Sequence, residues 1–312
     1  MQTEAVWRAL PRKIRELLSE ESLAEVQEIR LRSGQPLLLK KTEGLFSLGK
    51  EGVLVSMSDK GGIRISTADL RETVSLLSAY SLYAFEEELR QGYITIEGGH
   101  RVGFCGKTVM ENGEIRTLRQ INALNIRIAK EQKGWGEEFL PWLMEKEDFC
   151  HTLIVSPPGC GKTTLLRDIV RCLSQRGRTI GVVDERGEIA PLRDGIPQMD
   201  VGPCTDVLEG CPKAKGMVLL LRSMSPDIIA VDELGRREDI DAVEEVLNAG
   251  VKLIATAHGR DFADLETRPQ LRSLVRKKVF ERYLFLSNRN GTGTAEEIRN
   301  REGKIIWKGA KE

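Results

Sequence analysis

The sequence predicts an α/β protein in which a parallel sheet, covered by helices on both faces, follows a smaller α+β domain. Three observations carry this prediction: the chain length, mixed helical and alternating periodicities in the first part, and regular strand–helix alternation in the second. With 312 residues, the chain is long enough for about two domains. We expect domains at 1–130 and 149–312, joined by a charged connecting helix at 131–148 that carries Trp135 and Trp142.

The composition excludes several classes of protein. Lysine plus arginine and aspartate plus glutamate each total 47, and this balance argues against a basic nucleic-acid coat. The longest apolar run, Met217 to Leu221, is far shorter than the roughly 20 residues that span a bilayer. The N-terminus lacks the apolar core of a signal peptide. Six scattered cysteines without a CxxC pair disfavour a zinc site or a disulfide framework, so we expect a reduced cytosolic setting in which a partner provides any membrane contact.

The first part mixes two periodicities. Val6, Leu10, Ile14, Leu17 and Leu18 recur at helical spacing, which predicts one helix over the segment 1–25. The expected elements that follow are short strands within 26–56, a helix through Leu70, Val74 and Leu77 capped by Ser66 or Thr67, a second helix at about 82–91, and a β-rich unit at 93–128 with a turn at Asn112-Gly113.

The second part alternates between strands and helices. Strand-like runs lie at 152–156, 179–184, 227–232 and 251–257, and this repetition predicts a parallel sheet. We expect the 251–257 strand to lie between or close to the 152–156 and 227–232 strands. The interval 186–216 holds four prolines and two cysteines, which predicts a long functional loop.

The segment SPPGCGKTT joins a buried strand to a helix, which is the context that a P-loop requires. Glycines allow the backbone N–H groups to face a phosphate, and the helix N-terminus adds its positive dipole. Lys162 would reach the β- and γ-phosphates of ATP, and Thr163 would offer its hydroxyl to Mg²⁺. The predicted nucleotide-binding residues are Ser156, Pro157, Pro158, Gly159, Cys160, Gly161, Lys162, Thr163 and Thr164. Ser156 stands where the strict pattern has glycine, and we expect binding to survive this departure.

The strand Asp227-Ile-Ile-Ala-Val ends in two acids, Asp232 and Glu233. Ligands and catalytic groups sit at the carboxyl ends of parallel strands. Asp232 would therefore hold Mg²⁺ through water, and Glu233 would polarise the attacking water. The alternative is that both acids only cap a strand end at the surface.

Two more strand ends carry polar residues. Asp184 and Glu185 follow the second strand and could assist the metal or the water, or instead cap a helix or form ion pairs. His258 follows the fourth strand and could sense the γ-phosphate or position water, or instead be a hydrogen-bonded structural histidine.

Many P-loop enzymes complete their site with an arginine from a neighbouring subunit. Any one arginine of this chain can equally be a solvated surface charge. The candidates are Arg101 at a predicted hairpin, Arg116, Arg119 and Arg127 at the end of the first domain, Arg222, and Arg236 and Arg237 after the acid pair.

Longer segments resemble a known superfamily. LRSMSPDIIAVDELGR at 221–236 and LIATAHG at 253–259 resemble the secretion ATPases, which power type II and type IV secretion and pilus assembly. Asp184-Glu185 matches their acidic box and His258 their histidine box. The segments EIRLRSGQPL, GGHRVGFCGKTV and FERYLFLSNRNGTGTAEEI resemble, more narrowly, the stage III sporulation AA family of endospore-forming bacteria. The superfamily often carries Gly-Glu where this chain has Asp232-Glu233, which leaves open whether Glu233 or Glu185 is the main catalytic acid.

The resemblance implies a RecA-like P-loop ATPase core behind an α+β domain, with ATP and Mg²⁺ as cofactors. It also implies a ring, a hexamer, with nucleotide at subunit contacts. The implied setting is the mother-cell cytoplasm, beside the membrane, where the ring would act with other stage III sporulation operon proteins and a membrane-bound partner on the channel to the forespore. Two other functions stay open: a nucleic-acid-dependent ATPase, against which the charge balance and the few aromatic residues argue, and a nucleotide-gated scaffold that seldom hydrolyses ATP.

Overall fold

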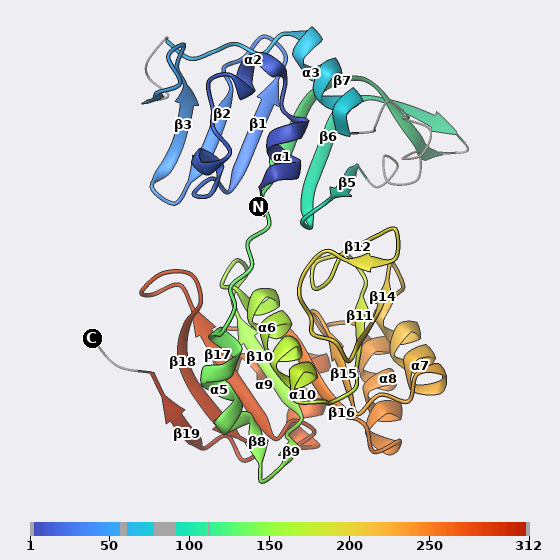
Figure 1. Cartoon of the computed structure of the whole chain (residues 1–312). Helices are drawn as coiled ribbons and strands as arrows, with labels where there is room; N and C mark the ends of the chain where they lie inside the picture. Colours follow the sequence, from blue (N-terminus) through green and yellow to red (C-terminus); the bar gives the residue numbers. More distant parts are fainter. Residues whose placement is uncertain (1–2, 57–60, 78–91, 112, 310–312) are drawn as a thin grey trace. The chain divides into compact units, whose positions relative to one another are not determined.

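The computed structural model describes residues 3–56, 61–77, 92–111 and 113–309. The chain divides into two compact units, Met1–Lys130 and Glu131–Glu312. Figure 1 shows the elements of each unit. In the described part of the chain, no helix combines the length and apolar character that crossing a bilayer requires.

The first unit is built on a seven-stranded antiparallel sheet in the order β4-β3-β2-β1-β7-β6-β5. Apolar residues of the helices and of the sheet face share one core, so the helices cover that face. The strands are β1 (Glu28–Arg32), β2 (Leu38–Lys41), β3 (Gly44–Leu48), β4 (Leu54–Ser56), β5 (Tyr93–Ile96), β6 (His100–Glu111) and β7 (Glu114–Arg127), and the helices are α1 (Glu4–Ala9), α2 (Arg12–Arg15), a 3₁₀ turn (Glu21–Leu23) and α3 (Thr67–Leu77).

The prediction of one continuous helix over the segment 1–25 is wrong. The helix stops at Ala9, and Leu10 takes an extended conformation (φ −76°, ψ 146°) before Pro11. A proline ring disfavours the helical conformation in the residue before it, and proline has no N–H for the helix ladder. The predicted cap of α3 is confirmed at Ser66, whose hydroxyl accepts a hydrogen bond from the Asp69 N–H at 3.2 Å. The helix expected at 82–91 and Asn112 of the predicted turn lie outside the described residues.

The second unit is built on an eight-stranded sheet in the order β14-β11-β15-β16-β10-β17-β18-β19. The first six strands are parallel, while β18 and β19 pair antiparallel at one edge. The strands are β10 (Thr152–Ser156), β11 (Ile180–Asp184), β14 (Thr205–Glu209), β15 (Ile228–Val231), β16 (Lys252–His258), β17 (Arg282–Ser287), β18 (Thr294–Asn300) and β19 (Ile305–Lys308). The predicted α/β class is confirmed, and β16 lies between the P-loop strand β10 and the acid-bearing strand β15, as expected.

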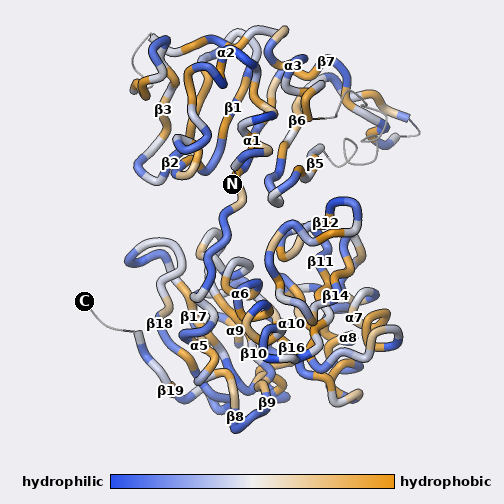
Figure 2. The backbone as a smooth tube through the Cα atoms, viewed as in Figure 1, coloured by the Kyte–Doolittle hydropathy of each residue, from blue (hydrophilic) through white to orange (hydrophobic). Residues whose placement is uncertain are grey.

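Helices cover both faces of this sheet. One core joins α5 and α6 to the sheet, and a separate core joins α7 to α10 to its other face. The central strands β10, β11 and β15 are buried along their whole length, and Figure 2 shows the apolar colouring gathered in this region. The helices are α5 (Trp135–Leu143), α6 (Lys162–Gln175), α7 (Lys213–Ser223), α8 (Arg237–Asn248), α9 (Phe262–Thr267) and α10 (Pro269–Arg276).

Two segments differ from expectation. The stretch 131–148 forms helix α5 and a short hairpin, β8 (Met144–Glu145) with β9 (Asp148–Phe149), and belongs to the second unit. The reason is packing: the Gly136 N–H donates to buried Asp168 of α6 at 2.6 Å, and Phe139 enters the core. The interval 186–216 is a loop only in part. It contains the hairpin β12 (Leu192–Arg193) with β13 (Ile196–Pro197), strand β14 and the start of α7.

One buried group gives a stability prediction. The hydroxyl of Tyr283 in β17 is fully buried and has no hydrogen-bond partner among the described residues. Burial raises the pKa of this phenol. A buried polar group without a partner carries a desolvation penalty, so we expect Tyr283→Phe to raise the free energy of unfolding by about 1 kcal/mol. Urea denaturation followed by circular dichroism measures this, and a clear fall in stability would show that the hydroxyl has a partner.

Candidate functional site

The predicted phosphate-binding loop leaves the end of β10 and enters α6 at Lys162. Gly159 (φ +73°) and Gly161 (φ +81°) adopt the left-handed conformation, which residues with a side chain rarely take. A Cβ atom at Gly161 would also lie 3.3 Å from the ring of Trp135, which closes that side of the loop. The loop therefore depends on both glycines, and its curve leads directly into the positive end of α6.

Lys162 points back into this loop and is only 7% exposed. Its ammonium donates to the carbonyl oxygens of Ser156 and Pro157, both at 3.1 Å, and to the Ser156 hydroxyl at 3.2 Å. Burial lowers the pKa of Lys162, while the negative charge of Asp232 acts in the opposite direction. The serine that replaces the first glycine of the P-loop pattern thus supplies one of the contacts that hold the lysine.

Asp232 lies one residue beyond the end of β15, beside the start of α6. Its Oδ2 accepts a hydrogen bond from the Thr163 hydroxyl at 2.9 Å. Its Oδ1 accepts from the Glu233 N–H at 2.9 Å and from the Thr256 hydroxyl. A hydroxyl and a carboxylate side by side are the oxygen ligands that Mg²⁺ prefers, so Thr163 and Asp232 fit a magnesium site.

Glu233 and His258 form the second part of the site. Glu233 has a left-handed backbone (φ +40°), which is uncommon for a residue with a side chain. Its carboxylate lies 3.3 Å from His258 Nε2 and 3.5 Å from the Arg186 guanidinium. His258 Nδ1 lies 3.1 Å from the Lys162 ammonium. The histidine therefore connects the phosphate-loop lysine to the acid expected to orient water.

The acids after β11 have other partners. Asp184 is buried, and its carboxylate accepts backbone N–H bonds from Glu188, Ile189 and Ala190 at 2.8 to 2.9 Å. Burial raises the pKa of Asp184, although these three hydrogen bonds oppose the effect. The structure does not show the predicted alternative of a helix cap, because the segment 185–190 is a loop and the Asp184 oxygens hold that loop.

Glu185 matches the ion-pair alternative. It accepts a hydrogen bond from Lys213 at 2.5 Å and lies 3.5 Å from the Arg236 guanidinium. Burial pushes the pKa of Glu185 upward, but the two cations outweigh it and lower the pKa overall. Of the two acids proposed to orient water, Glu233 is the one in contact with His258.

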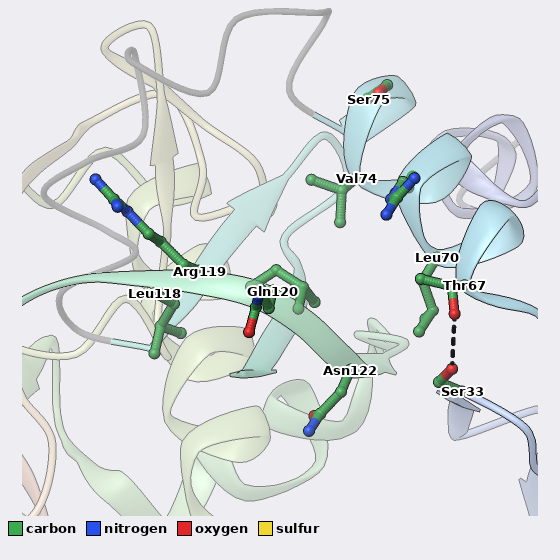
Figure 3. Close-up of a pocket in the computed structure, with 11 residues that line it drawn as sticks. Ser33, Thr67, Leu70, Val74, Ser75, Leu118, Arg119, Gln120 and Asn122 are labelled. Atoms are coloured by element: carbon green, nitrogen blue, oxygen red, sulfur yellow. Dashed lines mark hydrogen bonds between the residues drawn. The ribbon is translucent and has the colours of Figure 1, made fainter. Parts of the chain in front are cut away.

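The predicted trans arginines Arg101, Arg116, Arg119 and Arg127 all lie on β6 and β7 of the first unit. Arg101 stacks on the Tyr93 ring at 3.8 Å. In the register of β6 and β7, Arg127 lies opposite Arg101. Arg116 lies 3.3 Å from Glu111. Arg119 is exposed and lines a cavity of about 820 Å³ between α3 and β7, with Leu118 beside it (Figure 3). Their proposed action on a neighbouring subunit stays a prediction.

Three further arginine candidates lie in the second unit. Arg236 pairs with Glu185, and Arg237 begins α8. Arg222 lies near the end of α7.

Comparison with known proteins defines the family. The family model described as "Sporulation stage III, protein AA" matches residues 1–306. The chain belongs to this family. The Stage III sporulation protein AA of Bacillus subtilis (strain 168) is 43% identical over 306 residues, covering 95% of each chain. The predicted resemblance to the sporulation family is therefore confirmed over nearly the whole chain.

Solved structures support the fold of this family member. The ATPase DotB of Legionella pneumophila matches with a TM-score of 0.54 at 16% identity, covering 90% of this chain and 78% of that one. The pilus retraction motor PilT with bound ADP matches with a TM-score of 0.54 at 14% identity, covering 83% and 74%. At such identities the likeness establishes the fold alone, and it agrees with the predicted P-loop α/β class.

Sequence reasoning did not single out several residues of the site in this family member. Arg186 contacts Glu233, and Lys213 contacts Glu185, but in each pair the two residues belong to segments far apart in the sequence. Thr256 could have been found, because side chains two apart in a strand share a face and His258 was already a candidate. Trp135 against Gly161 gave no signal in the sequence.

Proposed function

We propose that this protein is a Mg²⁺-dependent ATPase that drives a machine of the secretion-motor type during endospore formation. The observation that carries the proposal is the convergence of Lys162, Thr163, Asp232, Glu233 and His258 at the carboxyl ends of β10, β15 and β16. Each of these residue types has a distinct task in phosphoryl transfer. The fold shared with secretion and pilus ATPases supports this reading of the site.

The loop and α6 bind the phosphates of ATP. Backbone N–H groups at the start of a helix attract anions, and the Lys162 ammonium adds a full positive charge. Thr163 and Asp232 would hold Mg²⁺, which supplies positive charge to the β- and γ-phosphate oxygens when bound. Lys162 now donates to Ser156, Pro157 and His258, so ATP binding must exchange at least some of these contacts for phosphate oxygens.

Glu233 orients the attacking water, and His258 links the position of Glu233 to whether phosphate occupies the site. An ammonium group can only donate hydrogen bonds, so His258 Nδ1 accepts from Lys162. The neutral ring then carries its proton on Nε2, which faces the Glu233 carboxylate. When Lys162 moves to the phosphates, Nδ1 loses its donor and the position of Glu233 becomes sensitive to occupancy of the site.

The biological setting comes from the family and the resemblance. We propose that the protein acts in the mother-cell cytoplasm, as a hexameric ring, beside a membrane-bound partner encoded with the other stage III sporulation proteins. An arginine of a neighbouring subunit, from Arg101, Arg116, Arg119 or Arg127, would complete each site. On this assignment, ATP hydrolysis depends on assembly of the ring.

The test is ATP hydrolysis as a function of protein concentration, with molecular mass followed by light scattering. We expect the rate per subunit to rise as the mass increases, because the trans arginine enters the site only on assembly. A constant rate from a monomer would keep the ATPase and remove the ring. Tight ATP binding without turnover at any concentration would favour the nucleotide-gated scaffold or a motor that awaits its membrane partner.

A further inference from the structure

Thr256 lies on β16, level with the acid pair on the neighbouring strand β15. The parallel register pairs Val231 with Ala255, so the next residues along the two strands are Asp232 and Thr256. Thr256 is fully buried. A hydroxyl in the interior of a sheet needs partners, and this one has them on both sides.

The hydroxyl of Thr256 contacts both acidic residues of the site. It donates to Asp232 Oδ1 and accepts the backbone N–H of Glu233 at 2.9 Å. Asp232 Oδ2 faces the Thr163 hydroxyl, so donors engage both oxygens of this carboxylate. Thr256 thereby fixes the rotation of the Asp232 carboxylate relative to the start of α6.

The backbone of Thr256 holds the same turn. Its carbonyl oxygen accepts the N–H of Leu234 at 2.8 Å. Two consecutive N–H groups, those of Glu233 and Leu234, are therefore bound by one residue of the adjacent strand. Between them lies the left-handed backbone of Glu233, a conformation that persists only where the surroundings hold it.

We propose that Thr256 is a positioning residue that sets both the metal-binding carboxylate of Asp232 and the direction of Glu233. It makes no contact with substrate in this role and acts only through the two acids. The inference rests on the proposed function, since it assigns Asp232 to Mg²⁺ and Glu233 to water. Its hydroxyl, and not its bulk, is what the role requires.

Thr256→Val tests this directly, because valine keeps the shape and loses the hydroxyl. Partners that orient a metal ligand typically account for about 10- to 100-fold in metal affinity or activity. We expect T256V to weaken Mn²⁺ binding to the ADP complex about 10-fold, measured by electron paramagnetic resonance, and to lower ATP turnover by a similar factor. ADP binding in EDTA should stay at the wild-type level, because the phosphate loop is unchanged. Thr256→Ser should restore both Mn²⁺ binding and turnover.

Thr152 provides a matched control. It is also fully buried, lies on the adjacent strand β10 and uses its hydroxyl, here to the Cys150 carbonyl at 2.7 Å. T152V removes a hydroxyl from the same sheet near its opposite end and should leave Mn²⁺ affinity unchanged. Thermal melting of all variants separates loss of folding from loss of the site. If T256V does not fold, Thr256→Ala, which also lacks the hydroxyl, takes its place.

The outcomes separate the two proposals. Wild-type Mn²⁺ affinity and turnover in T256V would overturn the role of Thr256 and leave the proposed ATPase intact. Equal loss of Mn²⁺ affinity and turnover in T256V and in a folded T256S would also overturn it, because the hydroxyl alone would then not be sufficient for the role. A wild-type protein that never hydrolyses ATP would count against the proposed function, while the Mn²⁺ titration would still decide whether Thr256 positions Asp232.

Discussion

Replacing Glu233 with glutamine is expected to leave ATP binding intact and to reduce turnover at least 100-fold, since positioned acid–base groups typically contribute about 10²–10⁴-fold. The amide has the shape of the carboxylate and keeps an oxygen that can face His258 Nε2, which lies 3.3 Å from the Glu233 carboxylate. It has no negative charge to polarise water. The measurement is steady-state phosphate release together with the affinity for a fluorescent ATP analogue.

Glu185→Gln is the matched control for this experiment. The same acid-to-amide change is made one strand away, at a side chain that pairs with Lys213 and Arg236 instead of His258. We expect E185Q to retain most of the turnover, with any loss of stability visible in a melting curve. Wild-type turnover in E233Q together with abolished turnover in a folded E185Q would reverse the assignment and make Glu185 the catalytic acid.

The position of the candidate site could be predicted from the sequence, because the carboxyl ends of parallel strands meet at the same edge of a sheet. Ser156, Asp232 and His258 each follow or end an apolar run, so their proximity needed only the strand order. That order is confirmed: β16 lies between β10 and β15. Local pattern and one topological rule were sufficient here.

Packing between segments distant in sequence was harder to foresee. The helical spacing of apolar residues in the segment 1–25 ignores the restriction that Pro11 places on Leu10. The stretch 131–148 looked like a connector because its charges stand out, but Gly136 and Phe139 bind it to α6 and the core. The parallel pairing of β14 with β11 likewise depends on strand partners, which composition alone does not reveal.

Two of the site residues that the sequence did not reveal share the same cause. Arg186 and Lys213 have charged partners on other elements, and nothing in their own neighbourhood indicates those partners. In the sequence, Ser156 is a departure from the glycine pattern. In the structure, Ser156 has a specific role, because its hydroxyl and its carbonyl oxygen both accept hydrogen bonds from the Lys162 ammonium. A substitution in a motif therefore has to be judged by the contacts that the new side chain makes.

Lys162→Ala is expected to weaken ATP binding about 10- to 100-fold, because hydrogen bonds to charged groups contribute roughly 1.5–3 kcal/mol and each 1.4 kcal/mol is a factor of ten. Turnover should fall further, since the same charge also stabilises the transferred phosphoryl group. Fluorescence titration with an ATP analogue measures the first effect, and phosphate release measures the second.

Two changes occur together in Lys162→Ala, so a second variant is needed. Removing the ammonium takes a donor from the carbonyl oxygens of Ser156 and Pro157 and leaves space where the stem was buried. Lys162→Met fills that space without a charge. If both variants melt like the wild type and neither binds ATP well, the missing charge explains the loss. If Lys162→Met binds ATP as the wild type does, the lysine serves mainly to pack the loop, and the phosphate contact assigned to it is wrong.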